Sequence, residues 1–504
     1  MKRVVSCTEM KALDSGTIVN KGIPSCVLME RAALKVAEII ELKCESDKNQ
    51  EKILCVCGSG NNGGDGVALA RILYLHGYDV TIYLAGNSVH QTSEMSRQIK
   101  IANSYNVPFA DDMDFGRYSV IVDAIFGVGL SRPIEGKYKE IIDAINNISA
   151  YKVAVDIPSG INGNTGEILG TAFKADVTVT FAYKKIGLCL YPGRKIAGEV
   201  IVADVGIYGN ENEDPDYMEV EPRDIKLLPE HVPDGNKSTF GKVLIVAGSH
   251  GMCGASYLCA NGAFAAGAGM VQILTCEENR IPLQTMLPEA MVNCSEDEKG
   301  WQKVFDWCDV VTVGPGIGFS EESRQKVVWF LKEAKRTGKT IVVDADALNI
   351  IAQNPELYEY IDRNVILTPH IGEMHRLSGL RIDEIQRDRM SAAMKTSLKS
   401  KAVCVLKDAS TVVADSNGKI YFSLAGNSGM ATAGSGDTLT GIIAGISGRS
   451  SKLKDAKTDL AKIAAVSVLL HGMAGDFAAD EIGRSGMKAS DIAAYTSKIL
   501  KQYE

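Results

Sequence analysis

A strand-like run followed by a polar, glycine-rich segment is the first feature of the sequence that could do chemistry. The segment ILCVCGSGNNGGDG, from Ile53 to Gly66, has five glycines and holds Asn61, Asn62 and Asp65 between them. Glycine lets the backbone turn tightly and approach a ligand, and amides at a helix start attract phosphate. We expect that helix to begin near Val67. An ordinary tight turn is the alternative, but it would not need three polar side chains.

Two further strand-like runs end in an acid: SVIVD at Asp123 and KVAVD at Asp156. In open α/β sheets, ligands bind in the crevice outside the carboxyl ends of the strands. We therefore expect both acids and the glycine segment to meet at one pocket, joined by the loops GVGLSRP (127–133) and DIPSG (156–160). For either acid alone, capping of the following turn is the alternative.

A second glycine-rich segment, GNSGMATAGSGD, runs from Gly426 to Asp437 and precedes a helix-like stretch from Thr438. Free amides at a helix start can bind an anion, and an aspartate directly after them can act on a group that attacks a phosphate. The alternative is a glycine-rich turn that only packs against a helix. Upstream, one strand-like run ends at Lys407 and another leads into TPHIGE.

Several familiar catalytic patterns are missing or incomplete. The string HIGEMH groups His370, Glu373 and His375, but it lacks the H-E-x-x-H spacing that places two histidines on one helix face, which disfavours a metal site. The string GKT at 338–340 has Glu333 where a phosphate-binding loop needs its first glycine. The sequence contains no G-x-S-x-G, which argues against a serine hydrolase of the α/β type.

The elements that must position these residues follow one local pattern: an apolar β-branched run, a glycine-rich turn, then a helix-period segment. Such continuous apolar strands joined by helices predict a mostly parallel sheet and an α/β class. Residues 210–238 break the pattern, because they hold four of the 14 prolines and open with an acidic cluster. We therefore predict two different domains, 1–218 and 239–504, joined by a linker at 219–238, with no aligned internal repeat.

Length and composition agree with a folded protein of more than one domain. The chain has 504 residues, 45% hydrophobic and 23% charged, with a net charge of -8 and no basic stripe, which disfavours nucleic acid and anionic membranes as partners. No apolar run near 20 residues and no signal-peptide core is evident, so a cytoplasmic location is expected. The 12 cysteines are scattered, with no C-x-x-C pair, which predicts reduced thiols and no zinc site.

The strings of the first half, together with LMERA from Leu28 and ADVTVTF from Ala175, closely resemble the NAD(P)H-hydrate epimerase family over residues 1–210. The resemblance implies a Rossmann-like three-layer αβα domain with K+ at Asn62, Asp123 and Ser159. It further implies that Asp156 is the acid/base group that interconverts the R and S hydrates. The implied substrate-binding residues are Asn61, Asn62, Gly63, Gly64, Asp65, Gly127, Val128, Gly129, Leu130, Ser131, Arg132, Pro133 and Asp156.

The second half resembles the NAD(P)H-hydrate dehydratase family, which has a ribokinase-like αβα fold, from Asn236 to the C-terminus. The strings that carry this resemblance are KVLIVAGS, GAS, GPGIG, VDADAL, TPHIGEM and GSGD. It implies Asp437 as the catalytic base, ADP as co-substrate with ATP as the alternative, and Mg2+. The implied hydrate-binding residues are Ala255, Gly318, His370, Ile371, Gly372, Glu373 and Asp437. The implied nucleotide-binding residues are Lys407, Asp408, Ala409, Ser410, Thr411, Asn427, Ser428, Gly429, Met430, Ala431, Thr432, Ala433, Gly434, Ser435 and Gly436.

The sequence departs from the second family's pattern at three places. Asn236-Lys237-Ser238 stands where H-K-G is common, Ile371 replaces a proline, and Asp408 replaces a glycine, which places a negative charge near the expected nucleotide phosphates. The leading hypothesis is a homo-oligomeric enzyme that epimerises and dehydrates hydrated NADH and NADPH. The alternatives are a ribokinase-like small-molecule kinase fused to a dinucleotide-binding domain, and a non-catalytic protein whose first half senses a dinucleotide.

Overall fold

The computed structural model describes residues 1–44, 51–86, 88–210, 214–230, 232–452 and 459–503. The chain folds into two units. Residues Arg3–Pro215 form the first unit, and residues Asp216–Glu504 form the second unit together with Met1–Lys2. Each unit is a parallel or mostly parallel sheet between helices, so the predicted α/β class is confirmed.

The first unit is built on a seven-stranded parallel sheet in the order β4-β3-β2-β5-β6-β7-β9. These strands are β4 (Phe109–Ala110), β3 (Asp79–Leu84), β2 (Lys52–Cys57), β5 (Val120–Ala124), β6 (Tyr151–Val155), β7 (Val177–Phe181) and β9 (Glu199–Ala203). A short parallel pair joins β1 (Lys2–Val5) to β8 (Lys184–Lys185). The helices are α1 (Cys7–Val19), α2 (Ser25–Lys43), α3 (Asn61–Leu75), α4 (Ser93–Ser104), α5 (Gly136–Asn146) and α6 (Gly193–Ile196).

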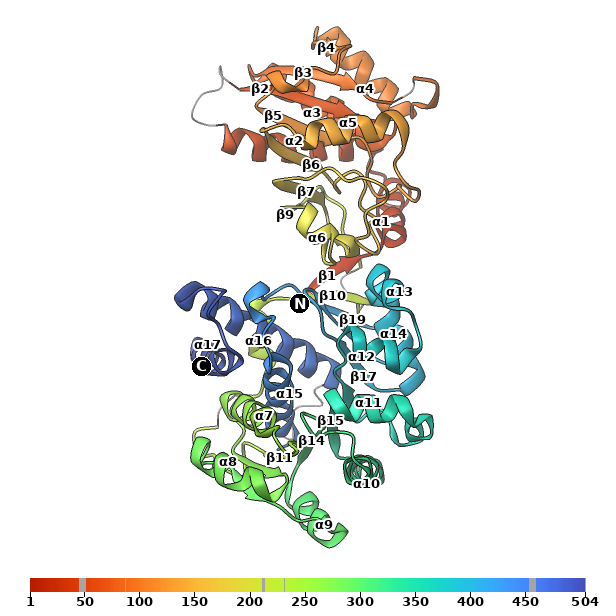
Figure 1. Ribbon diagram of the computed structural model, residues 1–504. Helices are drawn as coiled ribbons and strands as arrows, with labels where there is room; N and C mark the ends of the chain where they lie inside the picture. The colour runs from red at the N-terminus through yellow and green to blue at the C-terminus, as the bar shows by residue number, and fades with distance from the viewer. Residues whose placement is uncertain (45–50, 87, 211–213, 231, 453–458, 504) are drawn as a thin grey trace. The chain divides into compact units, whose positions relative to one another are not determined.

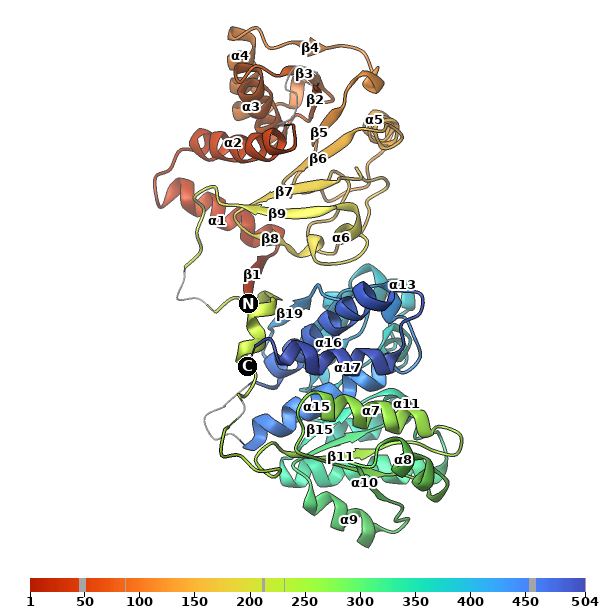
Figure 2. The same cartoon turned by 90° about the vertical axis from the view of Figure 1, so that its left-hand side faces the viewer.

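Both faces of this sheet are apolar because successive side chains of a strand point to opposite faces. On β2, Ile53 and Cys55 pack with residues of α2 and α3, whereas Leu54 and Val56 pack with the isoleucines of α5. Figure 2 shows the result as α2, α3 and α4 on one side of the sheet and α5 on the other. The continuous apolar strands of the sequence are therefore explained by burial on two faces.

The sheet of the second unit has the order β13-β12-β11-β14-β15-β16-β17-β18-β19-β10. Its strands are parallel except that β18 is antiparallel to both β17 and β19. The strands are β13 (Met291–Asn293), β12 (Met270–Leu274), β11 (Lys242–Val246), β14 (Val310–Val313), β15 (Thr340–Val343), β16 (Val365–Leu367), β17 (Val403–Leu406), β18 (Thr411–Ala414), β19 (Ile420–Ser423) and β10 (Tyr217–Val220).

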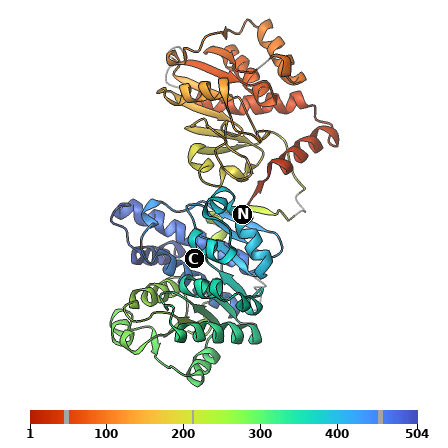
Figure 3. The same cartoon turned by 45° about the vertical axis from the view of Figure 1, so that its right-hand side comes forward.

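Helices cover both faces of the second sheet as well. They are α7 (Cys253–Ala265), α8 (Arg280–Met286), α9 (Glu298–Trp307), α10 (Glu321–Thr337), α11 (Ala345–Gln353), α12 (Ile371–Ser378), α13 (Ile382–Arg387), α14 (Arg389–Ser400), α15 (Ser435–Lys452), α16 (Leu460–Ile482) and α17 (Ala489–Leu500). One core cluster joins Val243 and Ile245 of β11 to α7, α15, α16 and α17, and another joins Leu244 and Val246 to α9, α10 and α11. Figures 1 and 3 show the blue C-terminal helices together with the light-green α7 on one face, and the dark-green to cyan helices α10, α11, α12 and α14 on the other.

The stretch predicted as a linker contains regular structure. β10 pairs with β19 in parallel, and a 3-10 helix follows at Pro222–Leu227. Pro215 and Pro222 flank this strand and do not interrupt it, and Pro222 occupies the first turn of the 3-10 helix, where its missing N–H is not needed. Part of the stretch predicted as a linker is therefore ordered secondary structure, while the exact limits 1–218, 219–238 and 239–504 remain a prediction.

One helix of the second unit is long and apolar enough to cross a membrane by composition. α16 has 23 residues, and an 18-residue stretch of it has a mean hydropathy of 1.3, so the expectation that no apolar run approaches 20 residues was wrong. In the structure, 72% of this apolar stretch is buried, and Ala464, Leu470 and Ala474 are fully buried core residues. The burial is typical of a core helix packed on a sheet. None of the 12 cysteines forms a disulfide within the described residues, and Cys55, Cys57 and Cys404 are buried.

Candidate functional site

The first glycine-rich segment lies at the start of a helix. α3 begins at Asn61, six residues before the expected Val67, so Asn61, Asn62 and Asp65 all stand on its first turns. A Cβ on Gly63 would lie 2.1 Å from the carbonyl oxygen of Gly58, so only glycine permits this close approach. No side chain caps this helix, because residue 60 is glycine. Its first amides therefore face outward as a ready site for an anion.

Asp123, at the end of β5, is 1% exposed and tightly hydrogen-bonded. The Ser159 hydroxyl and amide donate to its two oxygens at 2.6 and 2.7 Å, and the amide of Phe126 donates to the Ser159 hydroxyl at 2.8 Å. Burial raises the pKa of Asp123 to about 6, although the bonds from Ser159 oppose the shift. A cation beside the carboxylate would offset the cost of burying its charge.

The third residue of the predicted K+ set carries an unpartnered atom. Asn62 Nδ2 is buried and has no hydrogen-bond partner among the described residues, and a Cβ on Gly127 would lie 3.2 Å from Asn62 Oδ1. An amide can be turned over, which would bring its oxygen to the orphaned position. The carboxylate of Asp123, the Ser159 hydroxyl and this amide then form a set of oxygen donors, the kind that hard cations prefer. The residues present therefore fit a potassium ion.

Asp156 follows β6 in a strained conformation and is held by a buried lysine. Its φ is +69°, in the left-handed region that residues other than glycine rarely adopt. Lys185 Nζ donates to Asp156 Oδ1 at 2.5 Å, and the Thr180 hydroxyl and the Phe181 amide approach the same oxygen at 3.3 and 3.4 Å. Backbone strain of this kind costs about 1–3 kcal/mol and is common at functional sites.

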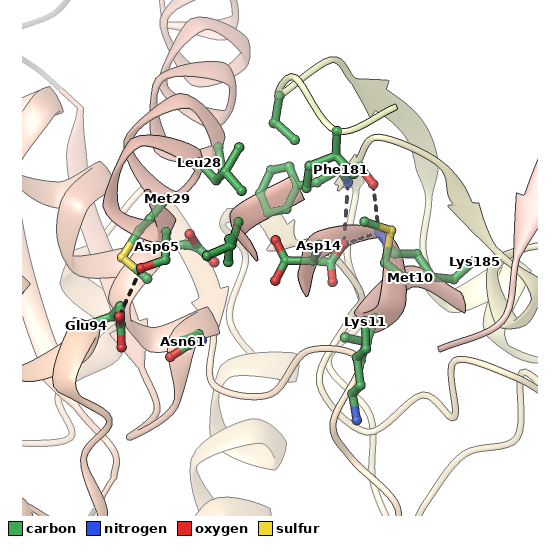
Figure 4. A pocket seen from close by; sticks show the side chains of 17 residues that line it. Met10, Lys11, Asp14, Leu28, Met29, Asn61, Asp65, Glu94, Phe181 and Lys185 are labelled. Atoms are coloured by element: carbon green, nitrogen blue, oxygen red, sulfur yellow. Dashed lines mark hydrogen bonds and ion pairs between the residues drawn. The ribbon is translucent and has the colours of Figure 1, made fainter. Parts of the chain in front are cut away.

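Two adjoining cavities lie beside Asp156, with volumes of about 170 and 550 Å³. Asn61, Asp65, Val128 and Asp156 line both of them, and the larger one is bordered by every residue from Gly127 to Arg132. In Figure 4, Asn61 and Asp65 approach the smaller cavity from one side and Lys185 from the other. The structure thus brings the predicted loops and Asp156 to one hollow. Gly63, Gly64 and Pro133 are not among the residues that line either cavity, and the two glycines are buried at the start of α3.

Two more acids, Asp14 and Asp65, line the hollow, and the charge of Asp156 contributes to their pKa values. Burial, followed by the negative charges of Asp156 and Asp14, raises the pKa of Asp65 well above its usual value. Burial and Asp156 also raise the pKa of Asp14, on α1. The sequence did not predict Asp14 or Lys185 as site residues, because Asp14 belongs to no motif of α1 and Lys185 stands in a lysine pair. Their roles depend on contacts between distant segments.

The second glycine-rich segment leads into α15, which begins at Ser435 rather than near Thr438 as expected. Gly434 has φ +88°, and a Cβ there would lie 2.1 Å from Leu258, so the turn requires glycine. Asp437 therefore stands in the first turn of a helix whose leading amides face the loop. Burial and the charge of Asp344 raise the pKa of Asp437 to about 6, with a smaller contribution from Asp346.

Side chains of α16 anchor both ends of this segment. The Gly426 amide and Asn427 Nδ2 donate to the two oxygens of Asp476, at 2.8 and 2.9 Å. At the other end, His471 Nε2 donates to the carbonyl oxygen of Ser435 at 3.0 Å. Burial lowers the pKa of His471 to about 4, so its ring is neutral. The sequence offered no signal for either anchor, because both lie in an alanine-rich core helix.

A buried charged cluster lies next to Asp437. Lys407 Nζ donates to Asp344 Oδ1 at 2.6 Å, and the Thr440 hydroxyl donates to the other oxygen of Asp344 at 2.6 Å. Burial lowers the pKa of Lys407, but Asp344, Glu373 and Asp437 outweigh it and raise that pKa above its usual value. The ammonium therefore stays charged between three carboxyl groups, where it can also meet a phosphate.

His370 caps α12, and the hydrogen bonds fix its tautomer. Nδ1 accepts from the amides of Gly372 and Glu373 at 2.9 and 3.3 Å, so the ring proton is on Nε2, which faces Glu373 Oε1 at 3.2 Å. Burial raises the pKa of Glu373 to about 7. Ile371 is the first residue of this helix, a position that proline also favours, which explains why the replacement is tolerated.

Asp408, the other notable departure, has its charge balanced. Arg389 at the start of α14 pairs with Asp408 through Nε, and both side chains are largely buried. The Asp408 carbonyl accepts from the Thr411 hydroxyl at 3.1 Å, which closes the loop between β17 and β18. The extra carboxylate therefore adds no net charge to the loop. Asn236 Oδ1 accepts from the Ser238 amide at 2.9 Å, a local turn that explains the third departure.

The remaining predicted residues of the second unit lie on the same edge of its sheet. Gly318 has φ +77°, and its amide donates to Asp346 Oδ2 at 2.9 Å, while Ala255 stands on the first turn of α7. Asp346 and Asp437 are near enough for the charge of Asp346 to raise the pKa of Asp437. Mg2+ commonly binds through one or two carboxylates together with substrate phosphates, so these two residues fit that ion. Among the described residues, no group of three or more His, Cys, Asp and Glu side chains forms a metal cluster.

Known proteins resemble both units. A family model described as YjeF-related protein N-terminus matches residues 25–187, and one described as NAD(P)H-hydrate dehydratase matches residues 243–498. A bifunctional NAD(P)H-hydrate repair enzyme from Thermofilum pendens is 35% identical and covers 99% of this chain and 96% of its own length. Another from Coxiella burnetii is 37% identical, with 94% of each chain covered. The solved structure of a ribokinase-like superfamily protein from Enterococcus faecalis is 26% identical, with a TM-score of 0.51, and covers 58% of this chain and 99% of its own.

Proposed function

The chain belongs to the family of bifunctional NAD(P)H-hydrate repair enzymes, and we propose that Asp156 and Asp437 are the groups that perform its two reactions. The protein interconverts the R and S forms of hydrated NADH and NADPH and dehydrates the hydrate back to NAD(P)H. The second unit has the ribokinase-like fold of the dehydratases. The residues, the ions and the choice of nucleotide are our assignments.

For the epimerase, we assign the hollow beside Asp156 to the hydrate. The amides at the start of α3 and the segment Gly127–Pro133 would bind the pyrophosphate, since helix N-termini attract phosphate. Asp156 would then move the proton, which requires a separation of about 2.6–3.2 Å from the group it acts on. Asn62, Asp123 and Ser159 would hold K+. When bound, this ion would supply a positive charge beside the phosphate-binding amides.

For the dehydratase, we assign ADP as the phosphoryl donor, with ATP as the alternative. Hydroxide is a poor leaving group, so transfer of a phosphoryl group to the hydrate's hydroxyl, giving AMP from ADP, makes it a good one. Loss of phosphate then regenerates the nicotinamide double bond. Asp437 would take the hydroxyl proton, and the amides of Ala433–Gly436 would stabilise the transferring group. Mg2+ near Asp346 and Asp437 would supply charge to the phosphates.

One observation supports this assignment more than any other: Asp437 occupies the first turn of α15, directly after the glycine-rich turn that leads into this helix. A base beside an anion-binding helix start is what phosphoryl transfer to a hydroxyl requires. The raised pKa of Asp437, about 6, brings this carboxyl closer to neutral pH, where a general base works best. A homo-oligomeric state and a cytoplasmic location remain predictions.

The test is repair of separated hydrates by the purified chain. S-NADHX with ADP should give NADH, read at its absorbance maximum, together with one AMP and one phosphate for each NADH formed. R-NADHX alone should give S-NADHX without any nucleotide. ATP supporting a higher rate than ADP would contradict the choice of nucleotide. Failure of both nucleotides would contradict the dehydratase assignment and favour a small-molecule kinase or a dinucleotide sensor.

A further inference from the structure

Lys185 is the largest charged side chain that the first unit buries, with only 1% of the side chain exposed. A buried ammonium is costly unless it is paired and hydrogen-bonded. Its Nζ donates to Asp156 Oδ1 at 2.5 Å, to the Thr180 hydroxyl at 2.9 Å and to the Phe181 carbonyl at 3.0 Å. All three protons of the ammonium are thus used. The side chain is fixed in one orientation.

These contacts treat the two oxygens of Asp156 unequally. Oδ1 faces Lys185, Thr180 and the Phe181 amide. Oδ2 has no hydrogen-bond partner within the described parts of the chain. It is also not one of the fully buried polar atoms that lack a partner, so it remains accessible. Since Asp156 lines both cavities, the free oxygen is the one that can meet a bound molecule.

The other titratable groups around Asp156 do not balance its charge. Asp14 on α1 and Asp65 on α3 are acids whose pKa values are raised by burial and then by the charge of Asp156. Cys7, at the start of α1, has its pKa raised by burial and by Asp156 and lowered by Lys185. Lys11 lines the same cavities and has no ion pair with Asp156 among the described contacts. Lys185 is therefore the cation that contacts this carboxylate directly.

We infer that Lys185 is a positioning residue of the epimerase: it holds Oδ1 of Asp156 and so turns Oδ2 toward the substrate. The inference rests on the proposed role of Asp156. The short pair β1–β8 fixes the lysine, because Val5 pairs with Lys185 in parallel register. The N-terminal strand thus supports the reacting group without touching the substrate. A lysine that only stabilised the fold would not need to leave one carboxylate oxygen unpartnered at a cavity.

The test compares Lys185→Met with Lys174→Met, an exposed lysine of the same unit. Conversion of R-NADHX to S-NADHX is followed by chromatography without nucleotide, so that the second unit is idle. We expect Lys185→Met to lower kcat about a hundredfold, the usual worth of a general base, with a smaller change in KM. Lys174→Met should match wild type.

Two outcomes would overturn the inference: an unchanged kcat, or a change confined to KM. Should Lys185→Met fail to fold, the double variant Asp156→Asn/Lys185→Met removes both buried charges and should fold again, since a lone buried charge is the costly state. Continued unfolding of the double variant would also contradict the inference. If wild type itself does not convert R-NADHX, the proposed function fails and not the role of Lys185.

Discussion

Replacement of His471 by glutamine should change how the stability of the second unit depends on pH. His471 is 7% exposed, lies in the core helix α16, and donates to the Ser435 carbonyl at the start of α15. Burial, more than the nearby Lys407, lowers its pKa from 6.5 to about 4. A glutamine can donate the same hydrogen bond but does not titrate.

Proton linkage gives the direction and the magnitude of this pH effect on the stability of the second unit. Between pH 6.5 and 4, the unfolded chain binds a proton at His471 that the folded chain does not bind, so acidification favours unfolding. Each pH unit in this interval is worth about 1.4 kcal/mol, which gives about 3 kcal/mol in total. Glu373 and Asp437, whose pKa values are raised in the fold, act in the opposite direction. The difference between wild type and variant isolates the histidine.

The assay is urea unfolding followed by tryptophan fluorescence at pH 7 and pH 4. All three tryptophans, at 301, 307 and 329, lie in the second unit, so the signal reports on that unit alone. The variant should lose about 3 kcal/mol less than wild type on acidification. His250→Gln, at an exposed position, should behave as wild type. Equal losses for wild type and His471→Gln would refute the assignment of a neutral buried ring.

Three other contacts can be tested by substitution: the pair Arg389–Asp408, the close approach at Gly63 and the pair Lys407–Asp344. Arg389→Met should raise the KM for nucleotide about tenfold, which corresponds to about 1.4 kcal/mol, because it leaves the charge of Asp408 unbalanced. The double variant Arg389→Met/Asp408→Gly should restore the wild-type KM. Equal KM values for wild type and Arg389→Met would contradict this role of the ion pair. Gly63→Ala should abolish conversion of R-NADHX, because its Cβ would lie 2.1 Å from a carbonyl oxygen. Gly60→Ala, which has open space around its Cβ, should remain active. Equal activities of the two variants would count against the close approach at Gly63. Lys407→Met should destabilise the second unit by about 3–5 kcal/mol, as it leaves a buried carboxylate unpaired, and an unchanged urea midpoint would be inconsistent with that pair.

Much of the fold was predictable because burial on both faces leaves a strong trace in sequence. The runs at Ile53, Val243 and Val310 are continuous apolar strands, and all three are central in the sheets. Helix starts were less accurate. α3 and α15 begin before the predicted residues, because the glycines that weaken a helix in isolation are required there by close backbone contacts.

The side chains that lie together at the ends of neighbouring strands were predictable from the sequence. The residues that hold those side chains in place were not. Asp156 and the loop 127–132 meet at one hollow, as the strand-end pattern indicated. Lys185, His471 and Asp344 act through contacts with residues 29 to 96 positions away, and a single sequence carries no trace of such pairings. The ion pair that balances Asp408 is likewise visible only once α14 packs against β17.

The most direct test of two separate reactions in one chain is a mixed-hydrate assay with two variants. Equal amounts of R- and S-NADHX are incubated with ADP, and the NADH recovered is measured. Wild type should recover nearly all of it, Asp156→Asn should recover only the S half apart from slow spontaneous epimerisation, and Asp437→Asn should recover none while still interconverting the two forms. Full recovery by Asp156→Asn, or NADH formation by Asp437→Asn at the wild-type rate, would contradict the account.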